Sequence, residues 1–350
     1  MELSVCAMGY GYWDLFQKGG RVLSVNPSGA TIAGATAPTD NSPLHIFSNP
    51  SALAGVGTAS AAIGGWGTGW REEIHYDAYC NDVSRFNKGA MSPRGSFALA
   101  VPLGSGFTAV AGISTVAQYE MRGMMKVYQQ GSGTYPVLWK IMTADSTGDL
   151  NEAMAVLAGN AGKVRLGLAA GTRFGSGELT VYSNRAESSG MDSTCRNTWE
   201  SSSFALRAGA SIDMDFVRAY TSFVSGDDRY SSYAGAGAFA FFSFLKGGFM
   251  GTEIGLFDGD ELFMNGFISY PWAFDGMNFS LGINGYRPDN AQKTGMGISY
   301  GIDYAFRPHK VTAAYQWNSR YRNGTAVDTE KITWIYDSGE SFVIGYEIGF

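Results

Sequence analysis

The sequence is poor in charge and has no long apolar run. Only 16% of its 350 residues are Asp, Glu, Lys or Arg, whereas a soluble domain of this length usually carries about 25%. No uninterrupted apolar stretch approaches the ~20 residues that a transmembrane helix needs. These two shortages argue against an ordinary soluble domain and against a helical membrane protein.

Residues that bind metal or act as nucleophiles are also scarce. The cysteines match no metal-ligand spacing, and the histidines follow no catalytic motif: Cys6, Cys80, Cys195, His45, His75 and His309. The net charge of -6 comes without clustered Lys and Arg, which argues against binding to nucleic acid. The sequence therefore predicts a protein that is not an enzyme, with no cofactor, no metal and no nucleic-acid partner.

Two cysteines and the N-terminus carry minor expectations. Cys80 and Cys195 fall in predicted outer loops, where they could form a disulfide, although two unpaired thiols are the favoured expectation. The start, MELSVCAMGYGYWDLF, lacks the basic and apolar regions of a secretory signal. Since a barrel must be exported, we expect the sequence to be a mature or altered form.

Glycine, aromatic residues and period-2 alternation are what the sequence does contain. At 341–350, Phe342, Ile344 and Tyr346 alternate with Val343, Gly345 and Glu347. Such alternation predicts a strand with one face toward lipid and the other toward a lumen. Fourteen segments follow the pattern with varying clarity: 57–70, 97–103, 107–116, 164–174, 179–183, 203–212, 216–224, 233–245, 249–257, 262–272, 277–284, 296–306, 311–318 and 341–350.

The connections between these segments alternate in length. Every even-to-odd link is short, including Gly104-Ser105-Gly106 and, between 164–174 and 179–183, Gly175-Ser176-Gly177. The odd-to-even links are mostly long, and the longest is 117–163. Short turns on one rim and long loops on the other are typical of an outer-membrane barrel. The sequence therefore predicts an all-β, antiparallel transmembrane barrel of about fourteen strands, with 331–336 extending the last hairpin outward.

Residues 1–55 do not alternate and are rich in glycine and proline, which indicates irregular structure. An irregular backbone cannot face lipid, because its unpaired amides would cost several kcal/mol each. It can lie inside a barrel, where lumen side chains and water pair with it. We therefore expect a hatch, or plug, over residues 1–55 and a barrel over residues 56–350.

The run SGATIAGATAPTDNSPLHIFSNPSALAGVGTASAAIGGW, 28–66, resembles the hatch and first strand of the FadL family of outer-membrane transporters for hydrophobic compounds and the related PorV and PorQ proteins. In that family an Asn-Pro-Ala turn leads into the first of fourteen strands. The matching turn here is Asn49-Pro50-Ser51, which departs at its third position. The proline should bias Asn49 toward an extended conformation.

Charged residues on the inward faces suggest a divided lumen. Basic residues fall on the middle strands and acidic ones on later strands: Arg165, Arg173, Arg207, Arg218, Glu253, Asp303 and Glu347. Such a division could hold the hatch through charged hydrogen bonds, which is the favoured interpretation, or orient an anionic head group.

Segment 117–163 is unusually apolar for an outer loop. Asp145 or Ser146 could cap a short helix that carries Leu150, Met154 and Leu157 on one face. Because methionine suits varied apolar ligands, six residues are candidates for capturing a ligand: Met121, Met124, Met125, Leu150, Met154 and Leu157. A cap that packs only on neighbouring loops is the slightly favoured interpretation.

The leading hypothesis is a bacterial outer-membrane channel for passive uptake of hydrophobic small molecules such as fatty acids, with membrane lipid around the barrel. The alternative is a PorV- or PorQ-like barrel that docks other envelope or secreted proteins through its outer loops. An open lumen route or a lateral gap would favour the first, and a sealed lumen with a broad apolar outer surface would favour the second.

Overall fold

The computed structural model describes most of the chain. The described residues are 20–21, 24–78, 81–88, 92–130, 136–185, 193–242, 248–258, 261–272, 274–287, 295–323, 326–327 and 330–350. Among them, no helix is both long and apolar enough to cross a membrane.

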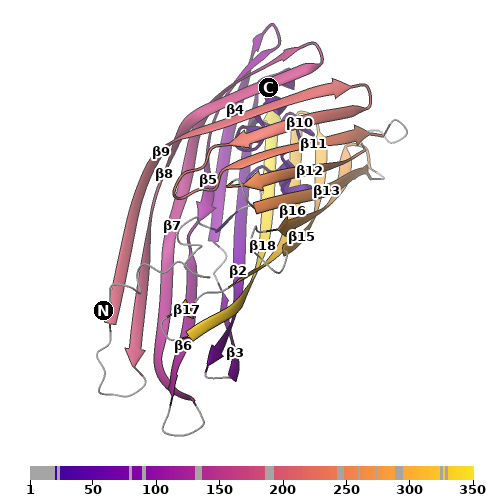
Figure 1. Ribbon diagram of the computed structural model, residues 1–350. Coiled ribbons are helices and arrows are strands. Elements are labelled where there is room, and N and C mark those ends of the chain that lie inside the picture. Colours follow the sequence, from indigo (N-terminus) through magenta and orange to yellow (C-terminus); the bar gives the residue numbers. More distant parts are fainter. Residues whose placement is uncertain are drawn as a thin grey trace.

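Fourteen antiparallel strands form a closed barrel (Figure 1). The last strand pairs with the first along their length, from Gly349 opposite Ser60 to Lys331 opposite Asp77, which closes the ring. The strands are, in ring order, β2 (Ser60–Ala78), β4 (Ser92–Gly104), β5 (Phe107–Gln118), β7 (Pro136–Ala161), β8 (Val164–Arg185), β9 (Ser193–Met214), β10 (Val217–Val224), β11 (Tyr233–Phe241), β12 (Phe249–Phe257), β13 (Glu261–Pro271), β14 (Met277–Arg287), β15 (Gly295–Phe306), β16 (His309–Asn323) and β18 (Glu330–Gly349).

Four further strands are not members of this ring. β3 (Asn81–Lys88) and β6 (Met121–Gln130) pair with the outer parts of β2 and β7. The two-residue β17 (Ala326–Val327) pairs with β18, and β1 (Gly20–Arg21) pairs with β5. Much of the predicted loops 71–96 and 117–163 is therefore strand. The expectation that 331–336 extends the last hairpin is confirmed, because β18 includes it.

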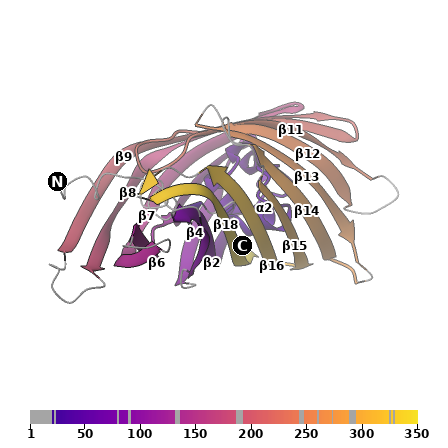
Figure 2. The same ribbon diagram turned by 60° about the horizontal axis from the view of Figure 1, so that its bottom comes forward.

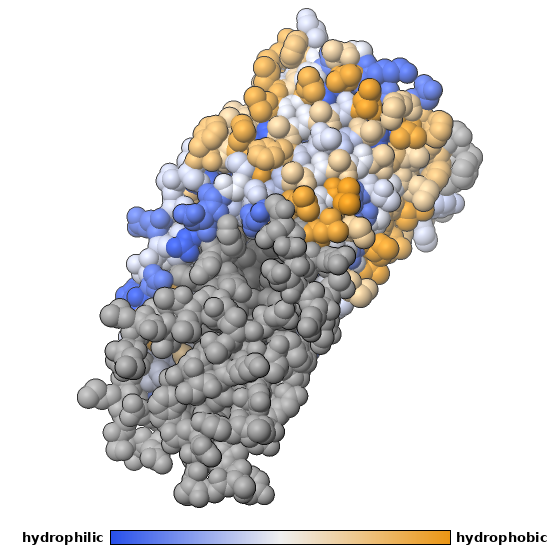
Figure 3. Space-filling view, in the orientation of Figure 1, coloured by the Kyte–Doolittle hydropathy of each residue, from blue (hydrophilic) through white to orange (hydrophobic). Residues whose placement is uncertain are grey.

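The alternating side chains separate an outer from an inner face as predicted. Phe342 and Ile344 are exposed on the outside of β18, whereas Val343 between them is buried. Figure 3 shows apolar residues spread over the upper, described part of one outer face. A band of this kind is what lipid solvates in a transmembrane barrel.

The short turns lie on one rim. Gly104, Ser105 and Gly106 all have positive φ in the turn between β4 and β5, where glycine supplies two of the three conformations without strain. Residues 162–163 join β7 to β8, and 215–216 join β9 to β10. The predicted division into short turns and longer outer connections is therefore present.

Two predicted elements are wrong, and their errors cancel in the strand count. Residues 164–185 form the single strand β8, so Gly175-Ser176-Gly177 is not a turn. A Cβ on Gly177 would lie 2.5 Å from the indole nitrogen of Trp199. Glycine there makes room for the Trp199 ring within the sheet rather than reversing the chain.

The second error concerns 145–161, which is part of strand β7 and not a loop with a helix. Leu150 and Met154 are four residues apart, a spacing that places them on one face of a helix and also on one face of a strand. Leu157 distinguishes a helix from a strand. Seven residues after Leu150, it would lie on the same face as Leu150 in a helix but on the opposite face in a strand. Leu157 is 54% exposed, whereas Leu150 and Met154 are buried.

The strands of the barrel wall differ in length. β7, β8 and β9 are long, but β10 pairs only with the end of β9 next to the turn at 215–216, from Met214 opposite Val217 to Arg207 opposite Val224. Figure 1 shows these tall strands beside the shorter β10–β13. The outer part of β9 therefore rises above its neighbour, and the connection 225–232 begins at this step.

Residues 24–56, which we call the hatch segment, lie on the concave side of the sheet (Figure 2). The segment contains α2 (Pro27–Thr31) and the 3-10 helices η2 (Pro43–Phe47) and η3 (Pro50–Gly55). Leu44, Ile46 and Leu53 are buried in a core shared with inward-facing residues of the wall, including Trp66 and Val343. The hatch segment thus packs against the lumen side of the barrel through apolar as well as polar contacts.

Cys195, at the outer end of β9, is in a disulfide bond. The favoured expectation of an unpaired thiol is therefore wrong for this residue. Cys6 and Cys80 lie outside the described residues.

Candidate functional site: the hatch segment and the barrel wall

The Asn-Pro turn caps a helix and ties it to the wall. Asn49 has an extended conformation (φ -124°, ψ 99°), as predicted from the proline that follows it. Its Oδ1 accepts hydrogen bonds from the Ser51 amide (3.1 Å) and hydroxyl (2.8 Å), and its Nδ2 donates to the Thr221 carbonyl (3.2 Å). The turn leads into η3, and β2 begins only at Ser60. The turn is therefore separated from the first strand by η3 and does not lead directly into it as expected.

Two glycines bring the backbone of the wall against this turn. A Cβ on Gly167 would lie 2.2 Å from the Pro50 carbonyl oxygen, and one on Gly209 would lie 2.0 Å from Asn49 Oδ1. Real side chains cannot approach so closely, so only glycine fits beside the turn. Ser51 completes the contact, because its hydroxyl lies 3.4 Å from the hydroxyl of Ser211 on β9.

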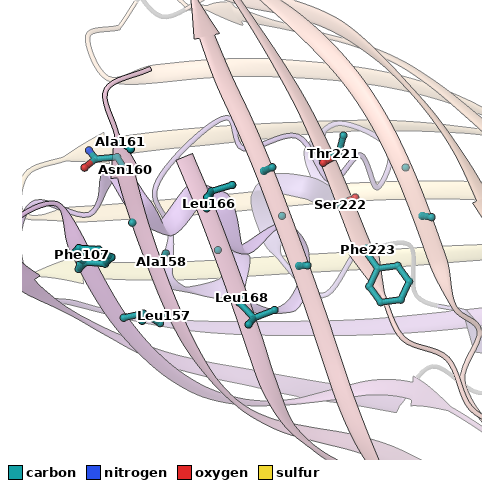
Figure 4. A pocket seen from close by; sticks show the side chains of 17 residues that line it. Phe107, Leu157, Ala158, Asn160, Ala161, Leu166, Leu168, Thr221, Ser222 and Phe223 are labelled. Carbon is teal, nitrogen blue, oxygen red and sulfur yellow. The ribbon is translucent and has the colours of Figure 1, made fainter. Parts of the chain in front are cut away.

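An apolar groove of about 670 Å³ lies on the opposite side of the same strands. Figure 4 shows Phe107, Leu157, Leu166 and Leu168 on one side of the groove and Phe223 on the other. These rim residues are all exposed on the outer face of the barrel, and the floor between them is built mainly of alanine and glycine.

Gly167 and Gly209 line the groove and also contact the hatch turn. At this place the wall between the lipid-facing groove and the hatch segment is therefore a single layer of backbone with small side chains. The sequence does not reveal the groove, because its lining depends on the register of successive strands, and one of these strands, β7, was predicted to be a loop.

A buried ionic cluster lies beside the hatch segment. Glu152 Oε1 accepts from Arg173 Nη2 (2.6 Å), and Glu152 Oε2 accepts from Arg207 Nη2 (2.7 Å). Side chains of Glu152 and Arg173 are fully buried, and that of Arg207 is 3% exposed. Arg207 Nη1 also donates to the Phe47 carbonyl of the hatch segment (2.7 Å), so the cluster holds the segment through its backbone.

Other lumen charges also hold the hatch segment or pair with one another. Arg218 donates to the Pro38 carbonyl (2.8 Å) and, like Arg165, pairs with Asp213. Glu253 accepts from the Thr36 amide (2.7 Å) and from the hydroxyl of Tyr220 (2.8 Å). These contacts are those that the favoured interpretation, anchoring of the hatch, requires.

The remaining predicted charges lie around Lys310. Its ammonium pairs with Asp40 of the hatch segment and lies 3.4 Å from Asp303. Glu347, Lys310 and Ser42 line one small gap beside the hatch segment.

The predicted division into a basic and an acidic wall does not hold. Glu152 and Asp213 stand among the arginines and pair with them. The alternation pattern predicts Glu152 in the outer loop 117–163, away from the lumen. Its place on β7, two residues from Leu150 and Met154, puts it on the inner face.

The six candidate capture residues do not form one surface. Leu150 and Met154 are buried inside, whereas Leu157 faces outward at the groove. Met124, on β6, is 43% exposed. The side chains of Met121 and Met125 lie outside the described part of the structure. The helical face predicted to carry Leu150, Met154 and Leu157 is absent, because β7 is a strand.

Asp40 connects the hatch segment to β16 and to His45, whose Nε2 is 2.6 Å from Asp40 Oδ1. Burial acts to raise the pKa of Asp40, but the charge of Lys310 and the hydrogen bond from His45 outweigh burial and hold the pKa well below its usual value. The carboxylate is therefore charged at neutral pH and stabilises this attachment.

Acid is expected to loosen this attachment only well below neutral pH. Since the folded-state pKa is lowered, the contribution of Asp40 is complete above about pH 4 and is lost as the pH falls through the lowered value. Hydrogen exchange of the His45 amide, corrected for its intrinsic rate, should stay constant from about pH 8 to about pH 5 and rise in stronger acid. In Asp40→Asn, protection should be weaker at neutral pH; parent-like protection would contradict this role.

Among the residues that the structure describes, no group of three or more His, Cys, Asp or Glu side chains could hold a metal ion.

Comparison with known proteins gives matches of fold only. No family model matches the chain, and no curated protein matches its sequence. The structure is similar to a deltaS2 mutant of the TodX monoaromatic hydrocarbon channel, with a TM-score of 0.64, 10% identity and coverage of 88% of this chain and 94% of that one.

Two toluene transporters are similar as well. TodX of P. putida has a TM-score of 0.53 and 10% identity, over 96% of this chain and 99% of TodX. TbuX of Ralstonia pickettii has a TM-score of 0.50 and 12% identity, over 93% and 98%. At these identities the likeness concerns the architecture of the barrel.

Proposed function

We propose that this protein, which has the fold of the FadL-type barrels, is a passive channel of the bacterial outer membrane for hydrophobic small molecules. Transport would follow the concentration gradient. Molecules would pass from the lumen to the lipid-facing groove when the hatch turn moves away from the wall.

One observation carries this proposal: the groove and the hatch turn share Gly167 and Gly209. Side chains nearby on β9 and β10 are small, and the outer rim of leucine and phenylalanine suits an apolar molecule. Burying about 200 Å² of apolar ligand surface there would contribute roughly 5 kcal/mol before the cost of association. Such a site would hold a ligand weakly enough to release it.

The ligand class follows from the lumen charges. Fatty acids are the anionic candidates, and hydrocarbons such as toluene, which the similar transporters carry, are the neutral ones. Each basic residue of the predicted lumen set already pairs with a carboxylate of the protein. A fatty-acid carboxylate would have to displace one of these partners, so the pairing favours uncharged ligands.

The docking role, suggested by the resemblance to PorV and PorQ, remains the alternative, but one feature that would favour it is weaker than expected. That role needs a broad apolar surface on the outer loops, and Leu150, Met154 and Leu157 do not contribute to one. No other described feature of the outer connections replaces it.

Filling the groove tests the proposal. Ala210 lines the groove on the outer side of β9, so Ala210→Phe should leave the fold intact and slow uptake by about ten-fold, the effect of roughly 1.4 kcal/mol on a barrier. Uptake of labelled toluene and of a labelled long-chain fatty acid would be measured in cells whose outer membrane contains the protein.

Ala170→Phe is the matched control, because Ala170 faces outward on β8 but does not line the groove. Equal uptake by both variants would remove the groove from the route. If the parent raises the uptake of neither probe, the channel function itself is wrong.

A further inference from the structure

The connection between β10 and β11, residues 225–232, folds onto the inner side of the tall wall. We infer that these residues form a lid whose closure is coupled to the hatch segment through Arg173, Glu152 and Arg207. The inference rests on the proposed function only in that the lid would regulate the site proposed above; the coupling itself is a property of the protein without ligand.

Asp227 holds the lid closed. Its Oδ1 accepts from the backbone amides of Arg229 (2.7 Å) and Tyr230 (2.9 Å), which fixes the turn of the lid. Its Oδ2 accepts from Ser203 (2.6 Å) and from Arg173 Nη1 (2.8 Å), which fixes the lid to β9 and β8. One carboxylate therefore shapes the lid and attaches it to the wall.

Aromatic contacts extend the lid across the inner face. The guanidinium of Arg173 lies 4.1 Å from the centre of the Tyr230 ring. Arg229 lies over Trp199, and its carbonyl accepts a hydrogen bond from the hydroxyl of Tyr119 (2.6 Å). The lid thus covers an apolar part of the wall that includes Tyr119 and Trp199.

The same arginine continues toward the hatch segment. Arg173 donates to one oxygen of Glu152, Arg207 donates to the other, and Arg207 reaches the Phe47 carbonyl. A continuous chain of charged hydrogen bonds therefore runs from Asp227 in the lid to Phe47, two residues before the hatch turn.

The charges of this chain explain why the two ends should move together. Arg173, Arg207, Glu152 and Asp227 balance one another while the lid is closed. Lifting the lid removes Asp227 and leaves a net positive charge in a buried cluster, which is strongly unfavourable. Glu152 must then move toward Arg173, or water must enter the buried cluster. Either change weakens the hydrogen bond from Arg207 to the Phe47 carbonyl.

Asp227→Asn tests the coupling, because it removes the charge and keeps the shape of the side chain. Hydrogen exchange, followed by mass spectrometry on the full protein in lipid nanodiscs without ligand, should rise about ten-fold in the lid and in η2 and η3. The amides of Ser48, Ala52 and Val56, each bonded within the hatch segment, report on the latter. Amides near Ala33, held by Ser299, should not change.

Asp258→Asn is the matched control. Asp258 accepts from the Ser232 amide (2.8 Å) at the other end of the lid and does not contact the ionic chain. It should raise exchange in the lid alone. The inference is overturned if Asp227→Asn leaves η2 and η3 as protected as in the parent, or if Asp258→Asn loosens them equally.

Should Asp227→Asn fail to fold, Ser203→Ala replaces it. This variant removes one hydrogen bond to Asp227 and changes no charge, so it should raise exchange in the lid and, to a smaller extent, in η2 and η3. Loosening confined to the lid would overturn the coupling. Because no transported molecule is involved, these outcomes do not depend on whether the channel function is correct.

Discussion

Replacing Glu152 with Gln should lower the free energy of unfolding by about 3–5 kcal/mol, the usual cost of removing one partner from a buried ion pair. Glu152 and Arg173 are fully buried, and both oxygens of Glu152 accept hydrogen bonds from arginine. Glutamine is nearly isosteric but carries no charge. The glutamine oxygen could still accept from one of the two arginines. The NH2 group would face the other guanidinium, which would then lack an acceptor.

Unfolding by urea of the protein refolded into vesicles, followed by tryptophan fluorescence, would measure this loss. Glu178→Gln provides the control, because Glu178 pairs with Arg196, whose side chain is 67% exposed. A surface pair of this kind contributes little to stability, because water and salt screen it. If Glu152→Gln cost no more than Glu178→Gln, the buried cluster would not stabilise the barrel.

The sequence predicted the cleanly alternating strands well. In segments 277–284, 296–306 and 341–350, large apolar residues occupy one face without interruption, so the period of two alone determines which side chains meet lipid. The closed barrel and most of its short-turn rim followed from such segments, whereas the number of strands was right because two errors cancelled. The extended conformation of Asn49 followed from local sterics at the proline.

The errors arose where one spacing fits two structures. Leu150 and Met154 satisfy both helical and strand periods, and the alanines around them favour a helix. Because 145–161 was predicted to be part of a loop, Glu152 was not counted among the lumen residues. The lumen wall formed by the middle strands was therefore predicted to carry an excess of basic charge. In β8, Gly175 and Gly177 resembled a turn although they give space to neighbouring strands.

The candidate site could not have been derived from the sequence in this detail. The contact of Asn49 with Gly209 joins segments far apart in the chain, and the lining of the groove depends on the exact register of successive strands. Local patterns carry no information on which inward glycine meets the hatch turn. The anchoring arginines could be placed on the inner face, but not paired with their partners.

Locking the hatch turn to the wall should abolish uptake, because the proposed route opens only when the turn moves away from β9. The hydroxyl oxygens of Ser51 and Ser211, which sulfur atoms would replace, are 3.4 Å apart. A small shift would bring two sulfur atoms at these positions to the disulfide bond length of about 2.05 Å. The double variant Ser51→Cys/Ser211→Cys should therefore form a disulfide between the hatch segment and the wall upon oxidation.

The deciding measurement is uptake of labelled toluene by cells that carry this double variant, before and after reduction. Each single variant and the parent, measured with and without reductant, control for the native disulfide of Cys195. We expect the oxidised double variant to lose uptake by at least about ten-fold and the reduced one to recover the rate of the parent. Equal uptake in the oxidised and reduced states, with the cross-link verified by mass spectrometry, would contradict the proposal that the hatch turn controls passage through the wall.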